Sequence, residues 1–340
     1  MSIEKPRVLL TNDDGPPGPD SPYIYGLYLH LTRELGWEVK VVVPSSQKSW
    51  IGKAYQIHDT IRGRYYYPKD PNGHGEVSEV SRPLKEGEVA EWVLLDGTPA
   101  TCTNIGLHNL YYGEIDLLLS GPNFGRNTSA AFVLSSGTIG AALSASLSGT
   151  RAIALSYGTV KHRPPTEWHA PAHNLGLRII QRLWKNWGAD MDGLREGKVD
   201  LYNVNIPMVE ALATAEGLPV LWTRIWRNTY GRLFKADTLD AKPSPDVPAA
   251  GPGVSVTTEG GGREKVSKQE ISRLVFKFSP DMSGLIGSGP DALPEGSDGW
   301  AIEKGWASVT PLRASFAEPE AGDVFLDGAT IEDRFMKLKL

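Results

Sequence analysis

Residues 7–15 read RVLLTNDDG, a short apolar run that ends in a cluster of polar turn formers. The aliphatic residues up to Leu10 favour a strand, and the polar residues from Asn12 to Gly15 favour a tight turn directly after it. Two neighbouring carboxylates, those of Asp13 and Asp14, therefore stand at the end of the expected first strand. This stretch indicates both the fold class and the place where chemistry is expected.

A helix is expected after this turn, because Ser21 and Pro22 are typical of a helix start. The apolar residues that follow recur at the spacing of one helical face: Ile24, Leu27, Tyr28, Leu31 and Leu35. Gly36 is expected to end the helix. Residues 39–43 form the next apolar run, which is typical of a parallel strand buried on both faces.

The alternation of strand and helix continues along the chain. Further strands are expected at 92–95, 115–119, 152–156 and 201–206, with helices at 98–110, 138–147 and 171–187. Residues 120–127 are expected to be a loop. This order predicts an α/β fold with a doubly wound, mostly parallel sheet and helices on both faces.

The length of 340 residues fits a single domain over 1–340 that carries insertions. Residues 60–90 are polar and are expected to be a surface insertion. Residues 236–270 are rich in Pro and Gly and are expected to be a flexible insertion. Strands at 220–226 and 273–278 are expected to form a hairpin or smaller lobe. Residues 271–340 would then be a C-terminal extension with a role in oligomerisation.

Bulk composition excludes several classes of protein. The net charge of -5 gives no electrostatic reason to bind nucleic acid or an anionic membrane. Cys102 is the single cysteine, so no internal disulfide forms. The N-terminus has no apolar signal segment, and no run of about 18 apolar residues occurs. We therefore expect a cytoplasmic protein that acts on a small molecule.

Oxygen-bearing side chains follow each expected strand, and the ends of parallel strands meet at one edge of the sheet. In chain order these residues are Asn12, Asp13, Asp14, Ser45, Ser46, Ser49, Asp96, Thr98, Thr101, Ser120, Asn123, Asn127, Ser135, Ser136 and Thr138. Such ligands suit hard cations such as Mg²⁺, Mn²⁺ or Ca²⁺. From the residues alone, Asn-Asp-Asp-Gly is equally well a plain turn with a helix cap.

Residues 136–138, Ser-Gly-Thr, precede a helix of small residues and have two interpretations. The hydroxyls and free N–H groups at the helix start suit an anion such as phosphate. The alternative is an N-cap followed by close helix packing. His169 and His173 are four residues apart but lack the context of a metal motif. Cys102 is interpreted as a small buried residue.

Several segments in this order resemble the SurE family of survival-protein phosphatases and nucleotidases. The matching segments are 8–15, 43–49, 96–100, 120–127, 136–142, 203–207 and 308–312. They cover about two thirds of the chain and are more specific together than any single motif. The long insertions resemble a eukaryotic, fungal-type branch. Trp50 is a departure, since many members have Gly after the serine that corresponds to Ser49.

The resemblance implies a Rossmann-like core and one divalent metal ion per subunit, Mg²⁺ or Mn²⁺, with Ca²⁺ as the alternative occupant in a crystal. It places the metal ligands at Asp13, Asp14, Ser49 and Asn123. Phosphate contacts are expected from Asn12, Thr98, Asn127, Ser136, Gly137 and Thr138. The implied oligomer is a homodimer or homotetramer, assembled through a protruding hairpin and C-terminal exchange.

The implied activity is that of a 5'/3'-nucleotidase or broad-specificity acid phosphatase that acts on nucleoside monophosphates. Asp13, Asp14 and Asn123 are the expected catalytic residues, with Asp14 orienting the attacking water. One alternative is a non-catalytic nucleotide-binding protein on the same fold. A second is a dinucleotide-dependent enzyme, which the absence of G-x-G-x-x-G after the first strand disfavours.

Overall fold

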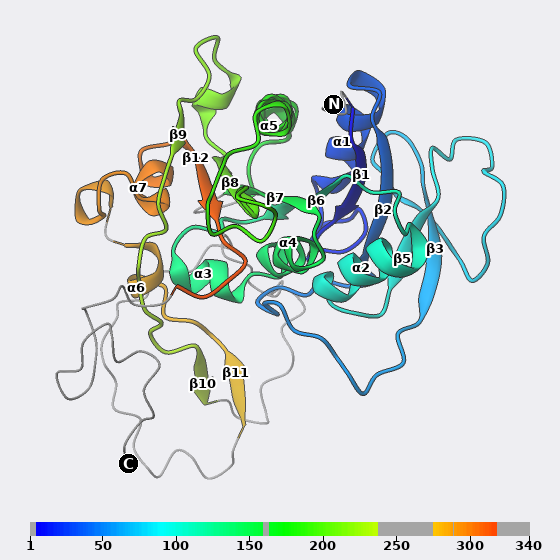
Figure 1. The fold of residues 1–340 in the computed structure, drawn as a ribbon, viewed down its shortest axis with the longest axis horizontal. Coiled ribbons are helices and arrows are strands. Elements are labelled where there is room, and N and C mark those ends of the chain that lie inside the picture. The colour runs from blue at the N-terminus through cyan, green and yellow to red at the C-terminus, as the bar shows by residue number, and fades with distance from the viewer. Residues whose placement is uncertain (1–4, 159–162, 237–274, 288, 318–340) are drawn as a thin grey trace.

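A computed structural model describes residues 5–158, 163–236, 275–287 and 289–317 of the chain. One ten-stranded sheet organises it, with the strand order β4-β3-β5-β2-β1-β6-β7-β8-β12-β9 (Figure 1). The strands are β1 (Arg7–Thr11), β2 (Glu38–Pro44), β3 (Gly63–Pro68), β4 (Gly75–Ser78), β5 (Trp92–Leu95), β6 (Leu117–Phe124), β7 (Arg151–Gly158), β8 (Leu201–Pro207), β9 (Val220–Trp222) and β12 (Ala307–Leu312). The central pairs, from β5 through β2, β1, β6 and β7 to β8, are all parallel. The predicted doubly wound, mostly parallel sheet is confirmed.

Helices cover both faces of this sheet, because the central strands are apolar on both sides. Val8 and Leu10 of β1 belong to one buried cluster with α1 (Ile24–Leu29) and α5 (His169–Lys185). Leu9 belongs to the other cluster, with α2 (Pro99–Ile105) and α4 (Gly137–Leu147). Figure 1 shows these two pairs of helices on opposite sides of the sheet.

Helix boundaries follow the prediction with one correction. The first helix begins after Tyr23, whereas Ser21 donates its hydroxyl hydrogen to the carbonyl of Gly15. Ser21 therefore closes the preceding turn and does not cap the helix. Short π-helical segments finish the first two helices, η1 (His30–Glu34) and η2 (Gly106–Leu110). The predicted end at Gly36 is confirmed, with a φ of 61°.

The prediction of a loop at 120–127 is wrong in part. Strand β6 continues to Phe124, with an irregular register between Ser120 and Asn123. Beyond this bulge β6 no longer pairs with β1, but it stays paired with β7 as far as Phe124. A short helix that the sequence did not predict, α3 (Ala130–Ser135), follows at once.

The expected hairpin has different strands from those predicted. β9 pairs with β12 and so belongs to the main sheet, whereas β10 (Phe234–Ala236) pairs with β11 (Phe276–Phe278). We call this two-stranded sheet the lobe; it projects from the side where α3 and α6 (Ser283–Ile286) lie (Figure 1). Most of the predicted insertion at 236–270 lies outside the described residues.

The remaining segments extend the sheet at both ends. Residues 60–90, expected as an insertion, carry β3 and β4 and bury Tyr66 and Tyr67. In the C-terminal region, α7 (Asp298–Glu303) leads into β12, which runs antiparallel to β8. Short 3-10 turns lie at Thr166–Trp168, Glu210–Ala213 and Pro290–Ala292. Within the described part of the chain, every helix is too short or too polar to cross a membrane.

Candidate active site

Asp13 follows β1 directly and is buried. The Thr138 hydroxyl donates to Asp13 Oδ1 at 2.7 Å, and the backbone N–H of Lys48 donates to the Asp13 carbonyl at 2.7 Å. Gly137 allows this approach, because a Cβ atom there would lie 2.8 Å from Asp13 Cβ. The carboxylate therefore sits against the start of α4, where free backbone N–H groups favour negative charge.

Asp14 is also buried, and its Oδ2 accepts a hydrogen bond of 2.8 Å from the backbone N–H of Phe124. Burial raises the pKa of the Asp13 carboxyl. Burial raises the pKa of Asp14 further, since the neighbouring charge of Asp13 adds to the effect. Among the described residues, neither carboxylate has an ion-pair partner. Two buried adjacent carboxylates without one require a cation or a proton.

The amide of Asn12 is used within the turn. Its Nδ2 donates to the Gly15 carbonyl at 2.8 Å and to Ser21 Oγ at 3.0 Å. Its Oδ1 accepts from the Gly15 N–H at 3.0 Å. This ring of bonds, which needs the positive φ of Gly15, holds the shape that places both aspartates.

Two asparagines at the end of β6 carry buried side-chain atoms that have no hydrogen-bond partner among the residues that the structure describes. They are Nδ2 of Asn123 and Oδ1 of Asn127. The assignment of oxygen and nitrogen within such an amide follows from its bonding partners. Such groups are costly unless a ligand completes them, and both lie at the strand-end edge where a ligand was expected.

The residues that hold Asn127 in place are not among the predicted site residues. Its backbone N–H donates to Asn205 Oδ1 at 2.7 Å, and its carbonyl accepts from Asn203 Nδ2 at 2.7 Å. Its own Nδ2 donates to Ser156 Oγ at 2.9 Å. The available signal was Asn-Val-Asn within an otherwise apolar strand, which puts two buried amides on one face.

Ser136 and Thr138 have separate roles; the N-cap interpretation of this loop is confirmed, and its contact with phosphate stays a prediction. Ser136 is the N-cap of α4, and its Oγ accepts from the Ile139 N–H at 3.2 Å. Thr138 instead holds Asp13. Thr98 is the N-cap of α2, and its hydroxyl donates to the Ala54 carbonyl at 2.6 Å. That hydroxyl therefore serves the helix start and a neighbouring loop.

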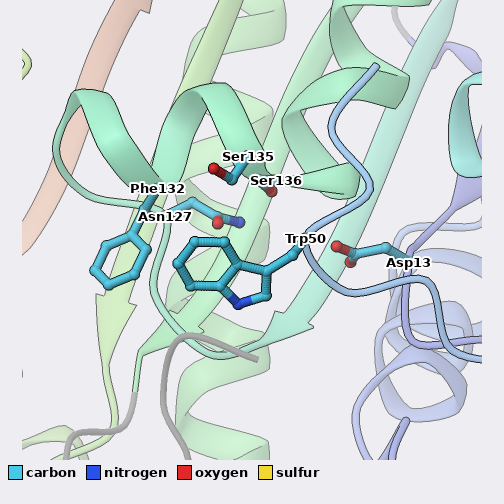
Figure 2. Close-up of a pocket in the computed structure, with 6 residues that line it drawn as sticks. All are labelled: Asp13, Trp50, Asn127, Phe132, Ser135 and Ser136. Carbon is cyan, nitrogen blue, oxygen red and sulfur yellow. The ribbon is translucent and has the colours of Figure 1, made fainter. Parts of the chain in front are cut away.

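A pocket with about 190 Å³ of empty space, partly open to solvent, lies at this edge (Figure 2). It is lined by Asp13, Trp50, Asn127, Phe132, Ser135 and Ser136. Of the predicted site residues, Asp13, Asn127 and Ser136 thus share one pocket. Gly137 and Thr138 adjoin it through their contacts with Asp13. Asp14 follows Asp13 in the chain and accepts from the N–H of Phe124, the residue after Asn123. Ser49 precedes Trp50 in the loop that Lys48 ties to Asp13.

His173 and Cys102 are buried in the core, and the half-buried His169 packs edge to face on Tyr23. His173 Nδ1 lies 3.0 Å from the Tyr157 hydroxyl, and burial lowers the pKa of this imidazole to about 3. Burial raises the pKa of the Cys102 thiol, which is unsuited to nucleophilic attack. No group of three or more His, Cys, Asp or Glu side chains that could hold a metal occurs in the described residues. A metal site here would rest on the two aspartates with amide and hydroxyl oxygens.

Comparisons with known proteins identify the family of this chain. The sequence profile of a family described as "Survival protein SurE" matches residues 8–232. A protein of Methanocella arvoryzae named 5'-nucleotidase SurE is 34% identical over 67% of this chain and 75% of its own length. A second 5'-nucleotidase SurE, from Carboxydothermus hydrogenoformans, is 31% identical over 67% of this chain and 74% of its own length.

Two further matches extend beyond the family segment. A Saccharomyces cerevisiae protein named probable tubulin–tyrosine ligase PBY1 is 34% identical over 91% of this chain. This chain spans only 41% of the length of that yeast protein. The crystal structure of a SurE protein from Aquifex aeolicus shares the fold, with a TM-score of 0.56 and 22% identity over 92% of this chain and 95% of its own.

Proposed function

The chain belongs to the SurE family, and on this premise we propose that it is a metal-dependent phosphomonoester hydrolase with nucleoside monophosphates as its substrate class. The observation that carries the proposal is the pair of buried carboxylates, Asp13 and Asp14, without an ion-pair partner in the described residues. The 5'-nucleotidase names of the relatives support the same substrate class. The ligase name of the yeast relative does not support a ligase activity for this chain, because this chain spans less than half of that protein.

The residues present fit a divalent cation. Carboxylate oxygens from Asp13 and Asp14, with oxygens from Ser49 and Asn123, would form a hard-ligand set suited to Mg²⁺ or Mn²⁺. When bound, such an ion neutralises charge on the phosphoryl oxygens and lowers the pKa of a bound water. Burial raises the pKa of both carboxyls, and a cation held between them would favour their charged forms.

Residues of the chain would orient the carboxylates, accept the proton of the attacking water and bind the phosphoryl oxygens. Thr138 holds Asp13, and the N–H of Phe124 orients Asp14. In the proposed reaction, the oxygen of a water forms a bond to phosphorus while the ester P–O bond breaks. Asp14 accepts the proton of that water, and the leaving alcohol takes a proton from solvent. Ser136 and Asn127 line the pocket. The Ser136 hydroxyl and the second hydrogen of Asn127 Nδ2 would donate to the phosphoryl oxygens.

The test is phosphate release from adenosine 5'-monophosphate with and without Mn²⁺ or Mg²⁺. We expect turnover that EDTA abolishes and added metal restores. Asp13→Asn and Asp14→Asn should each remove activity and leave the melting temperature unchanged or higher, because one buried charge is gone. Near-normal turnover by either variant at saturating metal would show that the site is misassigned. Nucleotide binding without any turnover would favour the non-catalytic alternative.

Assembly and domain organisation are part of the same proposal. We propose one SurE-like domain with a C-terminal extension, which assembles as a homodimer or homotetramer. Light scattering of the purified chain gives the mass of the assembly directly, and a monomer at micromolar concentration would contradict this part.

A further inference from the structure

Trp50 occupies an unusual backbone conformation beside the carboxylates. Its φ is 62°, in the left-handed region that glycine adopts freely and bulky residues avoid. Such a conformation costs free energy and persists only where the surrounding structure holds it. The loop that carries Trp50 is held at both ends, by Lys48 on the Asp13 carbonyl and by the Gly52 N–H on the Ser135 carbonyl at 2.8 Å.

Other aromatic rings surround the indole of Trp50. It meets Phe132 edge to face with ring centroids 5.7 Å apart, and Phe278 in the same manner at 5.1 Å. The ring of Tyr230 lies at 6.4 Å. We call these four side chains the aromatic wall. Phe278 and Tyr230 remain partly exposed, at 37% and 46%, so the wall continues from the pocket to the surface.

The aromatic wall and the catalytic edge belong to one pocket. Trp50 and Phe132 line it together with Asp13, Asn127 and Ser136. In Figure 2 the indole lies between the Phe132 ring and the Asp13 carboxylate, with the Asn127 amide and Ser136 alongside. One side of the pocket therefore offers oxygen ligands and hydrogen-bond donors, and the other offers uncharged ring surfaces.

We propose that the aromatic wall binds the planar ring of the substrate's leaving group, so that Trp50 selects phosphomonoesters of nucleosides over those of aliphatic alcohols. This inference rests on the proposed function and specifies its substrate class. A phosphoryl group next to Asp13 leaves the rest of the ester facing Trp50. Stacking on aromatic side chains is tolerant of base identity, because every base has a π-face. The wall therefore favours nucleobases in general and does not distinguish between them.

The test compares two substrates with the same reacting group, adenosine 5'-monophosphate and ribose 5-phosphate, which lacks the base. Trp50→Asn removes the ring and suits the backbone, since asparagine tolerates positive φ. We expect this variant to lose about 10- to 100-fold in kcat/KM for the nucleotide, largely through KM. Hydrolysis of ribose 5-phosphate should stay within about twofold.

Three further variants make the comparison specific. Trp50→Phe should keep most of the preference for the nucleotide, because it keeps an aromatic face. Phe278→Leu changes an outer ring at a partly exposed position and should lower the preference in the same direction by a smaller factor. Trp222→Asn is the matched control, a tryptophan that is 66% exposed on β9 and outside the pocket lining. It should leave both substrates unchanged.

The outcomes separate the two proposals. An equal loss on both substrates would show that Trp50 only supports the loop, and unchanged preference in Trp50→Asn and Phe278→Leu would overturn the role of the wall. Absence of turnover of both substrates by the unsubstituted protein, with metal present, would instead overturn the proposed function and the inference with it.

Discussion

Thr138 is the residue whose role differs most between sequence and structure. It follows the N-cap Ser136 by two positions, and the sequence alone does not separate capping from ligand binding. In the structure its hydroxyl donates to Asp13 Oδ1 at 2.7 Å and is fully buried. A side chain that orients a metal ligand in this way usually matters for activity more than for folding.

Substituting these two residues should therefore have different effects on stability. Thr138→Val keeps the shape but removes the donor to Asp13, and we expect kcat to fall about 10- to 100-fold, with weaker metal binding. Ser136→Ala removes the cap of α4 and should cost about 1 kcal/mol of stability; because its hydroxyl is also a proposed donor to the phosphoryl group, turnover should fall as well. Kinetics and melting temperature on the same preparations measure both effects.

Thr32→Val is the control for the first variant, because the Thr32 hydroxyl donates only to helix carbonyls, those of Tyr28 and Leu29. It should leave turnover unchanged. Full activity in Thr138→Val would show that Thr138 contributes only to helix packing and not to catalysis.

At the scale of elements, α7 is attached to the loop that carries Asn127. Asp298, at the first position of α7, is fully buried and accepts from the N–H groups of Ser129 at 2.8 Å and Trp226 at 2.9 Å. Arg126 of the same loop donates to Glu303 of α7 at 2.6 Å. A C-terminal element thus fixes a loop of the active site that lies far from it in sequence.

Asp298 should also make stability depend on pH. Burial raises the pKa of its carboxyl from 3.8 to about 6, although three backbone N–H groups oppose this change. The folded state therefore binds the proton more tightly than the unfolded state. The stabilising contribution is present in full below about pH 4 and is lost as the pH rises through about 6. A rise in pKa of this size corresponds to a loss of about 3 kcal/mol of stability.

Asp298→Asn removes the titrating carboxyl, so the stability of the variant should lack the part of its pH dependence that comes from Asp298. Urea unfolding at about pH 4.5, where most of the contribution is still present, and at about pH 7.5, where it is lost, measures this effect. The quantity compared is the change with pH in the difference in unfolding free energy between the two proteins. The unsubstituted protein should lose stability relative to the variant as the pH rises. A stability difference independent of pH would mean that Asp298 ionises normally in the folded state.

At the scale of the whole molecule, the pocket collects residues from distant parts of the sheet. Asp13 follows β1, Asn127 follows β6 and Ser136 begins α4, while the loop of Trp50 follows β2. All these segments are attached to one sheet, and helices pack on both of its faces. A ligand that binds only the folded site should therefore stabilise the entire fold.

Metal binding should therefore raise the melting temperature of the whole chain. At Mn²⁺ or Mg²⁺ about 100-fold above the dissociation constant, we expect about 2.7 kcal/mol of added stability. Asp13→Asn should start at equal or higher stability without metal and gain little when metal is added. Calorimetry with and without EDTA provides the measurement, and an equal gain in both proteins would place the metal elsewhere.

The parts of the fold that were predicted correctly are those with a local cause. Apolar runs such as 39–43 and 92–95 became β2 and β5, and Thr98-Pro99 began α2 as helix-start residues should. The errors have non-local causes. Ser21 satisfies a helix-start pattern but bonds to Gly15 instead. Strand β6 runs past Ser120 because β7 continues alongside it to Phe124.

The sequence by itself determined the layered α/β architecture and the position of Asp13 and Asp14 at a strand end, because alternating apolar segments and turn residues act over a few neighbouring positions. It did not determine what those residues contact. The bond from Thr138 to Asp13 spans 125 positions, and that from Asn127 to Asn205 spans 78. The aromatic wall likewise joins residues 50, 132, 230 and 278. Only the tertiary structure decided these contacts, since the packing of helices on both faces of the sheet brings such distant segments within bonding distance.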